Sequence, residues 1–134
     1  MLKAKLDIIE TPSPNFDERT LPVSLLVLHY TGMESGSAAL ERMCDPAAKV
    51  SAHYMVEEDG RIFHLVDEDK RAWHAGVSEW AGESNINSAS IGIEIVNGGH
   101  DCPLPSGELP PYPDVQINAA VSYTHLTLPT ILLV

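Results

Sequence analysis

The strongest constraint on the fold is a continuous apolar run at residues 24–32, S-L-L-V-L-H-Y-T-G, which stops at a histidine. A short run rich in Leu and Val is typical of a strand buried on both faces of a sheet. His29 stands at the end of this run, at the sheet edge where open α/β sheets place their sites. His29 is therefore a candidate metal ligand. On this segment alone, a hydrogen-bonded core histidine is the alternative.

A second apolar segment, residues 90–97, S-I-G-I-E-I-V-N, carries one acid in its middle. Burying a carboxylate costs several kcal/mol unless the group is paired or used. In a strand the three isoleucines alternate onto one face, and Glu94 shares the other face with Gly92. Gly92 leaves space for another group to approach Glu94. Glu94 is a candidate catalytic group, with a strand acid that reaches solvent as the alternative.

The intervening segments predict the remaining elements. A helix is expected over residues 35–44, ended by Asp45-Pro46. Residues 50–57 and 61–66 flank a Glu-Asp-Gly turn and predict a hairpin. Another helix is expected to start at Pro113-Asp114. Residues 11–22, 72–87 and 98–113 are expected to be irregular, and the second of these carries both tryptophans.

Composition narrows the function classes. The chain has 134 residues, enough for one domain with one modest core. Nineteen acidic residues against 8 basic ones give a net charge of −11, which argues against nucleic acid and against an anionic membrane surface as partners. No stretch reaches transmembrane length.

The two cysteines and the N-terminus indicate a compartment. Cys44 and Cys102 lie far apart in the sequence and have no reason to pair, and free cysteines fit a reducing environment. The first ten residues lack the long apolar core and the cleavage site of a secretory signal. We therefore expect a cytoplasmic protein.

Five segments, taken in order, resemble the zinc-dependent N-acetylmuramoyl-L-alanine amidases, which share their fold with the peptidoglycan-recognition proteins. The resemblance covers roughly residues 21–116, and five motifs in family order make it highly specific. The segments are L-V-L-H-Y-T-G (26–32), V-S-A-H-Y-M-V (50–56), D-G-R-I-F-H-L-V (59–66), A-W-H-A-G-V-S-E-W (72–80) and N-I-N-S-A-S-I-G-I-E-I-V-N (85–97).

The resemblance implies an α/β fold, a central mixed β-sheet flanked by helices, here incomplete at the C-terminus. It implies hydrolysis of the amide between N-acetylmuramic acid and the first L-alanine of the stem peptide, with peptidoglycan or a muropeptide as substrate. It assigns His29 as the first ligand of a catalytic Zn²⁺. The family's other two ligands belong to a C-terminal motif, H-S-D-I-A-P-G-R-K-x-D-P-G, that is absent here, and the surroundings of His125 do not match it.

Glu94 matches the family's active-site acid, whose implied role is to take a proton from the zinc-bound water. In related phage enzymes a tyrosine occupies the position of Ala52 and takes part in catalysis, so more weight falls on Glu94. His53, beside Ala52, is expected to be structural.

Three further residues are candidates for substrate binding. Trp73 and His74 belong to a loop whose flat rings suit a sugar or a stem peptide. A tryptophan that plugs the core is an equally weighted alternative for Trp73. Asn97 ends the Glu94 strand, within reach of a substrate's peptide backbone.

The C-terminal segment differs from the rest of the chain. No charged residue follows Asp114. Residues 122–134 resemble translated adaptor or vector sequence, and a native strand is the alternative. We therefore expect residues 1–121 to form the N-terminal part of an amidase domain and 122–134 to be a non-native tail. With only one metal ligand, a non-catalytic peptidoglycan-binding module and an inert fragment remain alternatives to an active amidase.

Overall fold

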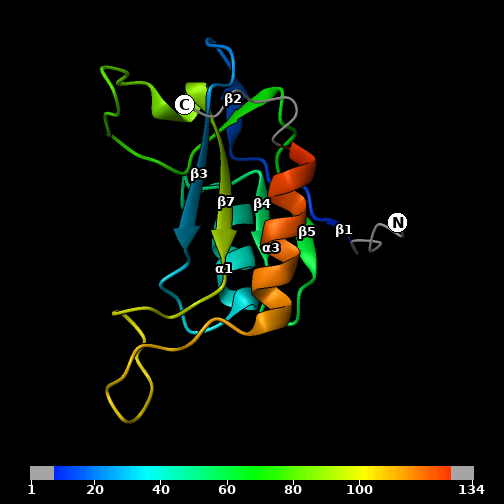
Figure 1. Cartoon of the computed structure of the whole chain (residues 1–134). Helices are drawn as coiled ribbons and strands as arrows, with labels where there is room; N and C mark the ends of the chain where they lie inside the picture. The colour runs from blue at the N-terminus through cyan, green and yellow to red at the C-terminus, as the bar shows by residue number, and fades with distance from the viewer. Residues whose placement is uncertain (1–7, 128–134) are drawn as a thin grey trace, which may run out of the picture.

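The computed structural model describes residues 8–127, in which five strands form one sheet in the order β1-β5-β4-β7-β3 (Figure 1). β4 and β5 pair in antiparallel fashion, and the other neighbouring strands pair in parallel. The predicted mixed sheet is therefore confirmed. The strands are β1 (Ile8–Glu10), β3 (Leu25–Tyr30), β4 (Tyr54–Val56), β5 (Ile62–His64) and β7 (Ser90–Ile95).

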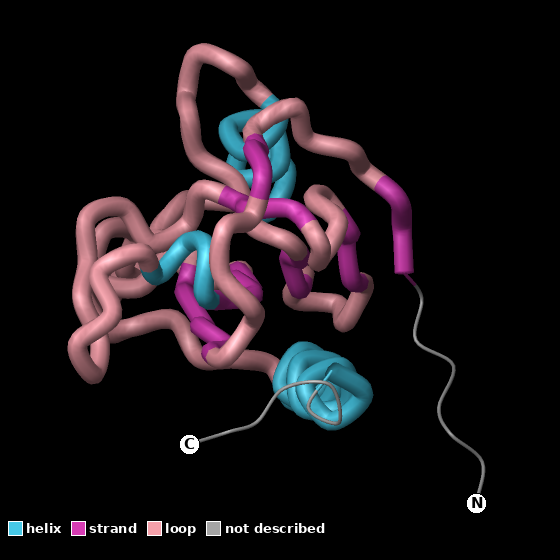
Figure 2. Tube along the Cα trace, turned by 90° about the horizontal axis from the view of Figure 1, so that it is seen from above, coloured by secondary structure: helices cyan, strands magenta, loops and turns pink. Residues whose placement is uncertain are grey.

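Helices cover the two faces of this sheet. Seen from above, α1 (Gly36–Cys44) and α3 (Asp114–Thr127) lie on opposite sides of the strands (Figure 2). The Ser35 side chain caps α1 by accepting a hydrogen bond from the backbone N–H of Ala38. In the described part of the chain, no helix is long and apolar enough to cross a membrane.

Alternation along the strands divides the core into two layers. In β7, Ile91 and Ile93 face α3, whereas in β4 Met55 faces α1. The predicted alternation of the isoleucines onto one face is confirmed. The layer beside α1 contains Ala39, Met43, Ala52, Met55, Phe63, Leu65, Val66, Ala72 and Val96, and the layer beside α3 contains Tyr54, Val56, Ile62, Ile91, Ile93, Ala119 and Ala120.

The prediction that residues 24–32 form a strand buried on both faces is wrong. In the described part of the sheet β3 is an edge strand whose side chains are partly buried or exposed, and Leu28 is 53% exposed. The apolar run reads as a central strand because Leu and Val would suit both faces. As the last strand of the described sheet it pairs with β7 on one side only, and its side chains are half-buried or exposed.

The predicted hairpin and helices are present, and four short elements escaped prediction. The turn between β4 and β5 uses Gly60 at φ +90°, a conformation that favours glycine. A small antiparallel pair, β2 (Phe16–Glu18) with β6 (Lys70–Ala72), falls partly in a segment expected to be irregular. β1 and the single-turn helix α2 (Ile86–Ala89) were also missed, because elements this short show no periodicity.

The boundary proposed between native and foreign sequence, at residues 121 and 122, falls within α3. Tyr123 packs against Tyr54 with ring centroids 4.4 Å apart, and the Thr124 hydroxyl donates to the carbonyl of Ala120. The side chains beyond Thr124, and all of residues 128–134, lie outside the described residues. The foreign origin of residues 122–134 stays a prediction.

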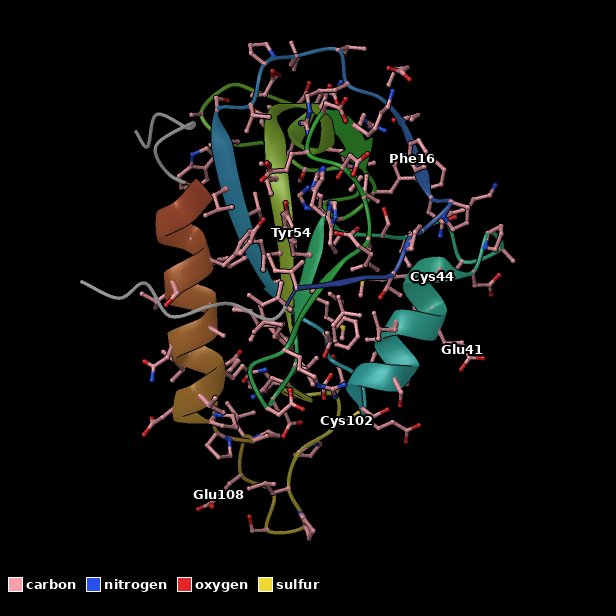
Figure 3. All side chains as sticks on the ribbon, turned by 90° about the vertical axis from the view of Figure 1, so that its right-hand side faces the viewer. Phe16, Glu41, Cys44, Tyr54, Cys102 and Glu108 are labelled. Carbon is pink, nitrogen blue, oxygen red and sulfur yellow. The ribbon has the colours of Figure 1, made fainter. Side chains whose placement is uncertain are left out.

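The cysteines are free, as expected. Cys44 ends α1, and Cys102 lies in the loop after β7 (Figure 3).

Arg19 ties the lead-in segment to two strands. Its guanidinium donates hydrogen bonds to four backbone carbonyls, those of Glu68, Lys70, Ser88 and Ser90. These carbonyls belong to the loop before β6, to β6, to α2 and to the start of β7. A planar fork of donors can satisfy such a cluster, and a lysine ammonium cannot match its geometry.

Replacing Arg19 with methionine should therefore lower the free energy of unfolding by about 3 kcal/mol or more, because buried carbonyls lose their donors. Arg61→Met is the matched control, since Arg61 makes an exposed ion pair with Asp59 and should cost less than about 1 kcal/mol. Urea denaturation of the three proteins measures both values. Equal losses in the two variants would contradict the anchoring role of Arg19.

Candidate functional site

The register of β3 and β7 sets His29 beside Glu94. The two strands run parallel, and His29 pairs with Glu94 as Val27 pairs with Gly92. Paired residues of neighbouring strands project to the same face of a sheet. His29 and Glu94 therefore lie on adjacent strands of one sheet, with their side chains on the same face.

His74 fills the space above Gly92. A Cβ atom built on Gly92 would lie 2.4 Å from the His74 ring, so only glycine allows the ring to rest against the strand. The loop that carries His74 is held by Asn87, whose Oδ1 accepts the backbone N–H of His74 and of Ala75 at 3.0 and 2.8 Å. The group expected to approach over Gly92 is thus an imidazole of this chain.

His74 connects to both neighbouring strands through its ring nitrogens. His74 Nδ1 lies 2.9 Å from His29 Nε2, and His74 Nε2 lies 3.0 Å from the hydroxyl of Ser90. Burial, reinforced by the neighbouring His29, lowers the pKa of His74 to about 3, and burial also lowers the pKa of His29. Both rings are therefore neutral at pH 7.

Glu94 borders a cavity of about 150 Å³ together with Trp73 and His74. Burial raises the pKa of the Glu94 carboxyl to about 7. Its Oε2 atom is buried and has no hydrogen-bond partner among the described residues. A carboxyl with these properties can accept a proton near neutral pH and give it back.

His29 borders a different hollow, a groove of about 480 Å³ along β3, the edge strand of the described sheet. Trp80, which is 67% exposed, and Ile86 also line this groove. His29 and Glu94 therefore border two separate hollows. His74 lines the cavity of Glu94, and its ring is hydrogen-bonded to His29 in the other hollow.

Trp73 lies beside the Glu94 cavity, and the substrate-binding role expected for it stays a prediction. Its backbone is tied to Ser51, since the Trp73 N–H donates to Ser51 Oγ at 2.9 Å and its carbonyl accepts the Ser51 N–H. Its side chain is only partly buried and borders the Glu94 cavity.

Asn97 is buried, and its amide anchors the loop after β7. Its Nδ2 donates to the carbonyl of Pro110 at 3.0 Å, and its Oδ1 accepts the N–H of Gly99 at 2.8 Å. Both ends of the amide are thus engaged within the protein. A substrate contact by Asn97 stays a prediction, and one to the side-chain amide would require these bonds to be exchanged.

His53 is structural, as predicted. It is fully buried, its Nδ1 accepts the N–H of Gly92 at 3.0 Å, and its Nε2 donates to the carbonyl of Lys70 at 2.9 Å. Burial is the main cause that lowers the pKa of His53 to about 4, so its ring stays neutral at pH 7. Through these two hydrogen bonds the ring links β7 to β6.

Two residues that hold His74 were not found from the sequence, Ser90 and Asn87. Both act on His74, which lies 16 and 13 residues earlier in the chain. The signal available in the sequence was that both residues are polar and lie at or just before the start of an apolar strand. A serine or asparagine in that position ordinarily marks a turn, so it did not indicate contact with His74.

The described residues contain no group of three or more His, Cys, Asp or Glu side chains placed to hold a metal ion. His29 is the one residue among them that the family resemblance assigns as a ligand.

The sequence of this chain is similar to those of known proteins. Residues 19–128 match the family described as N-acetylmuramoyl-L-alanine amidase. The 1,6-anhydro-N-acetylmuramyl-L-alanine amidase AmpD of Haemophilus influenzae is 35% identical over 117 residues, which cover 73% of this chain and 63% of that protein. The chain thus spans less than two thirds of this curated relative.

Solved structures agree with the fold. A selenomethionine derivative of AmpD superposes with a TM-score of 0.73 at 33% identity, over 96% of this chain and 78% of that one. AmiD from Escherichia coli, solved with the substrate anhydro-N-acetylmuramic acid-L-Ala-D-gamma-Glu-L-Lys, has a TM-score of 0.71 at 33% identity, over 80% and 43% of the two chains. The chain belongs to the N-acetylmuramoyl-L-alanine amidase family.

Proposed function

We propose that the protein of which this chain is part hydrolyses the amide between N-acetylmuramic acid and L-alanine of a muropeptide. The observation that carries the proposal is the pairing of His29 with Glu94 across β3 and β7, in a chain of this family. The names of the relatives support the bond and the substrate class, because they are amidases of anhydro-muramyl peptides. Two free cysteines fit action in the reducing cytoplasm on recycled fragments.

Glu94 is the proton-transfer group in this proposal. Its carboxylate takes a proton from the water that attacks the scissile carbonyl, and the resulting acid gives a proton to the leaving amine of L-alanine. A pKa near 7 suits both steps, because neither protonation state is costly to reach at neutral pH. The unpartnered Oε2 is free to make the hydrogen bond to water that the step requires.

The residues present fit part of a zinc site. His29 carries a neutral imidazole, and its hydrogen bond to His74 engages Nε2, which leaves Nδ1 without a partner in the described part of the chain. Bound zinc would acidify the attacking water and polarise the carbonyl. A catalytic zinc takes three protein ligands, so His29 accounts for one of them.

Trp73 and Trp80 complete the proposal as binding surfaces. Trp73 borders the Glu94 cavity and Trp80 the β3 groove, so each presents an aromatic ring beside one of the two candidate polar groups. Flat rings of this kind suit the apolar faces of a sugar.

A non-catalytic peptidoglycan-binding module is the second candidate. The observation that favours it is the lack of a three-ligand group among the described residues. The two candidates differ in metal content and in turnover, and the next two experiments separate them.

Zinc binding by the 134-residue chain should be weak, because one imidazole cannot hold the ion against water. Metal analysis after gel filtration should find far less than one zinc per chain. Stoichiometric zinc that a chelator removes would contradict this expectation.

Replacing residues 122–134 with a family-type C-terminal segment should restore zinc binding and release of L-alanyl peptides from muropeptides. In that protein His29→Ala should remove metal and activity together. Glu94→Gln should keep the metal and lower kcat by roughly 10²–10⁴-fold, because only proton transfer is disturbed. Unchanged kcat in Glu94→Gln would rule out the catalytic role, and binding without turnover in the completed protein would favour the binding module.

Glu94 should also make stability depend on pH. Its pKa rises from 4.5 to about 7 on folding, so the folded protein retains a proton that the unfolded chain has lost. Stability therefore falls as pH rises between these values, by up to about 3 kcal/mol. The Glu94→Gln variant lacks this pH dependence. The free energy of unfolding of the variant minus that of the wild type should therefore rise from about pH 5 to about pH 8.

Urea denaturation at both pH values measures this difference. Glu41→Gln is the matched control, because Glu41 lies on the exposed side of α1 (Figure 3) and should leave the pH profile of the wild type unchanged. If Glu94→Gln and Glu41→Gln both showed the same pH dependence of stability as the wild type, the pKa of Glu94 would not change on folding.

A further inference from the structure

Three hydrogen bonds in series connect Ile86, the first residue of α2, to His29. Ser90 Oγ lies 2.6 Å from the carbonyl oxygen of Ile86 and 3.0 Å from His74 Nε2. His74 Nδ1 lies 2.9 Å from His29 Nε2. Each distance is in the range of a formed hydrogen bond, so every contact in the series needs one proton between its two atoms.

The direction of the series follows from its first member. A carbonyl oxygen only accepts, and a serine hydroxyl has one proton, so Ser90 gives that proton to Ile86. Ser90 Oγ must then accept from His74, which places the single N–H of the neutral His74 ring on Nε2. His74 Nδ1 is consequently a bare acceptor, and the proton between the two rings belongs to His29 Nε2.

We propose that Ser90 and His74 are positioning residues that hold His29 in the Nε2–H tautomer and leave Nδ1 as its lone-pair nitrogen. The tautomer itself stands on the hydrogen-bond series, and its use in holding a metal ion rests on the proposed function. The two ring nitrogens point in different directions, so the tautomer decides from which side of the ring His29 can donate electrons to an ion.

The surroundings of His74 are shaped for this purpose. Gly92 provides the space under the ring, since any Cβ there would collide with it. Asn87 holds the His74 backbone, and Ser90 is fully buried, so no water competes for its hydroxyl. With both His74 nitrogens engaged, a contact from His74 to a substrate would have to use the face or edge of the ring.

The direct test is the tautomer of His29 in the 134-residue chain without metal or substrate. The chain is labelled with ¹⁵N-histidine, and a long-range ¹H–¹⁵N spectrum at about pH 7.5 distinguishes pyrrole-type from pyridine-type ring nitrogens. His29→Gln identifies the resonances of His29 by their loss. We expect a pyridine-type Nδ1 and a pyrrole-type Nε2. A proton on Nδ1 of His29 would overturn the proposal.

Variants test whether Ser90 and His74 impose that tautomer. Ser90→Ala removes the acceptor of His74 Nε2, so both rings should change from one tautomer to a mixture, with the two nitrogen resonances of His29 moving toward each other. His74→Asn keeps an acceptor oxygen near the position of Nδ1 and should preserve the His29 tautomer, whereas His74→Leu should lose it.

The outcomes are separable. An unchanged His29 spectrum in Ser90→Ala, or identical spectra in His74→Asn and His74→Leu, would overturn the positioning role even if the wild-type tautomer were as expected. Backbone amide spectra identify any variant that fails to fold. If Ser90→Ala does not fold, the His74 variants test the positioning role, and if the His74 variants do not fold, Ser90→Ala tests it. If the protein with a family-type C-terminal segment in place of residues 122–134 were inactive, the proposed function would be overturned. The result for the His29 tautomer would be unaffected.

Discussion

The parallel pairing of β3 with β7 is the constraint on which the site depends. It sets His29 beside Glu94 and Val27 beside Gly92, so a histidine from one segment and an acid from a distant one share a face. A shift of the register by one residue would turn Glu94 toward α3 and into the apolar layer formed by the isoleucines of β7. The same ladder that builds the sheet therefore also builds the candidate catalytic pair.

One face of β7 carries the polar residues in sequence. Ser90 orients His74, Gly92 leaves room for its ring, and Glu94 borders the cavity beyond it. These three residues alternate along a single strand, so they point the same way and act on neighbouring points of one loop. The opposite face of β7 is isoleucine and packs against α3. Function and packing are thus separated by the pleat of one strand.

Some buried polar groups of the described residues are satisfied by hydrogen bonds, and three buried side-chain oxygens, those of Ser78, Glu94 and Gln116, have no partner there. Arg19 and His53 are surrounded by hydrogen-bond partners, which makes them cross-links between the lead-in, β6 and β7. Glu94 has a buried oxygen without a partner among the described residues and a raised pKa. An unsatisfied buried group is costly, and such groups concentrate where they do chemistry.

The sequence by itself determined the fold class, the family and the two strand segments that carry His29 and Glu94. These depend on local periodicity and on motifs that lie within a few residues of each other. It also placed the start of α1 at Ser35 and of α3 at Asp114, because capping chemistry is local.

The tertiary structure alone decided what surrounds that pair. It showed β3 at the edge of the described sheet, where an apolar run had predicted a doubly buried strand. It brought Ser90 and Asn87 to His74, and it used the Asn97 amide to anchor a loop. Burial, ring placement and hydrogen-bond direction depend on contacts between residues far apart in the chain. A sequence pattern does not give the spatial distances between such residues.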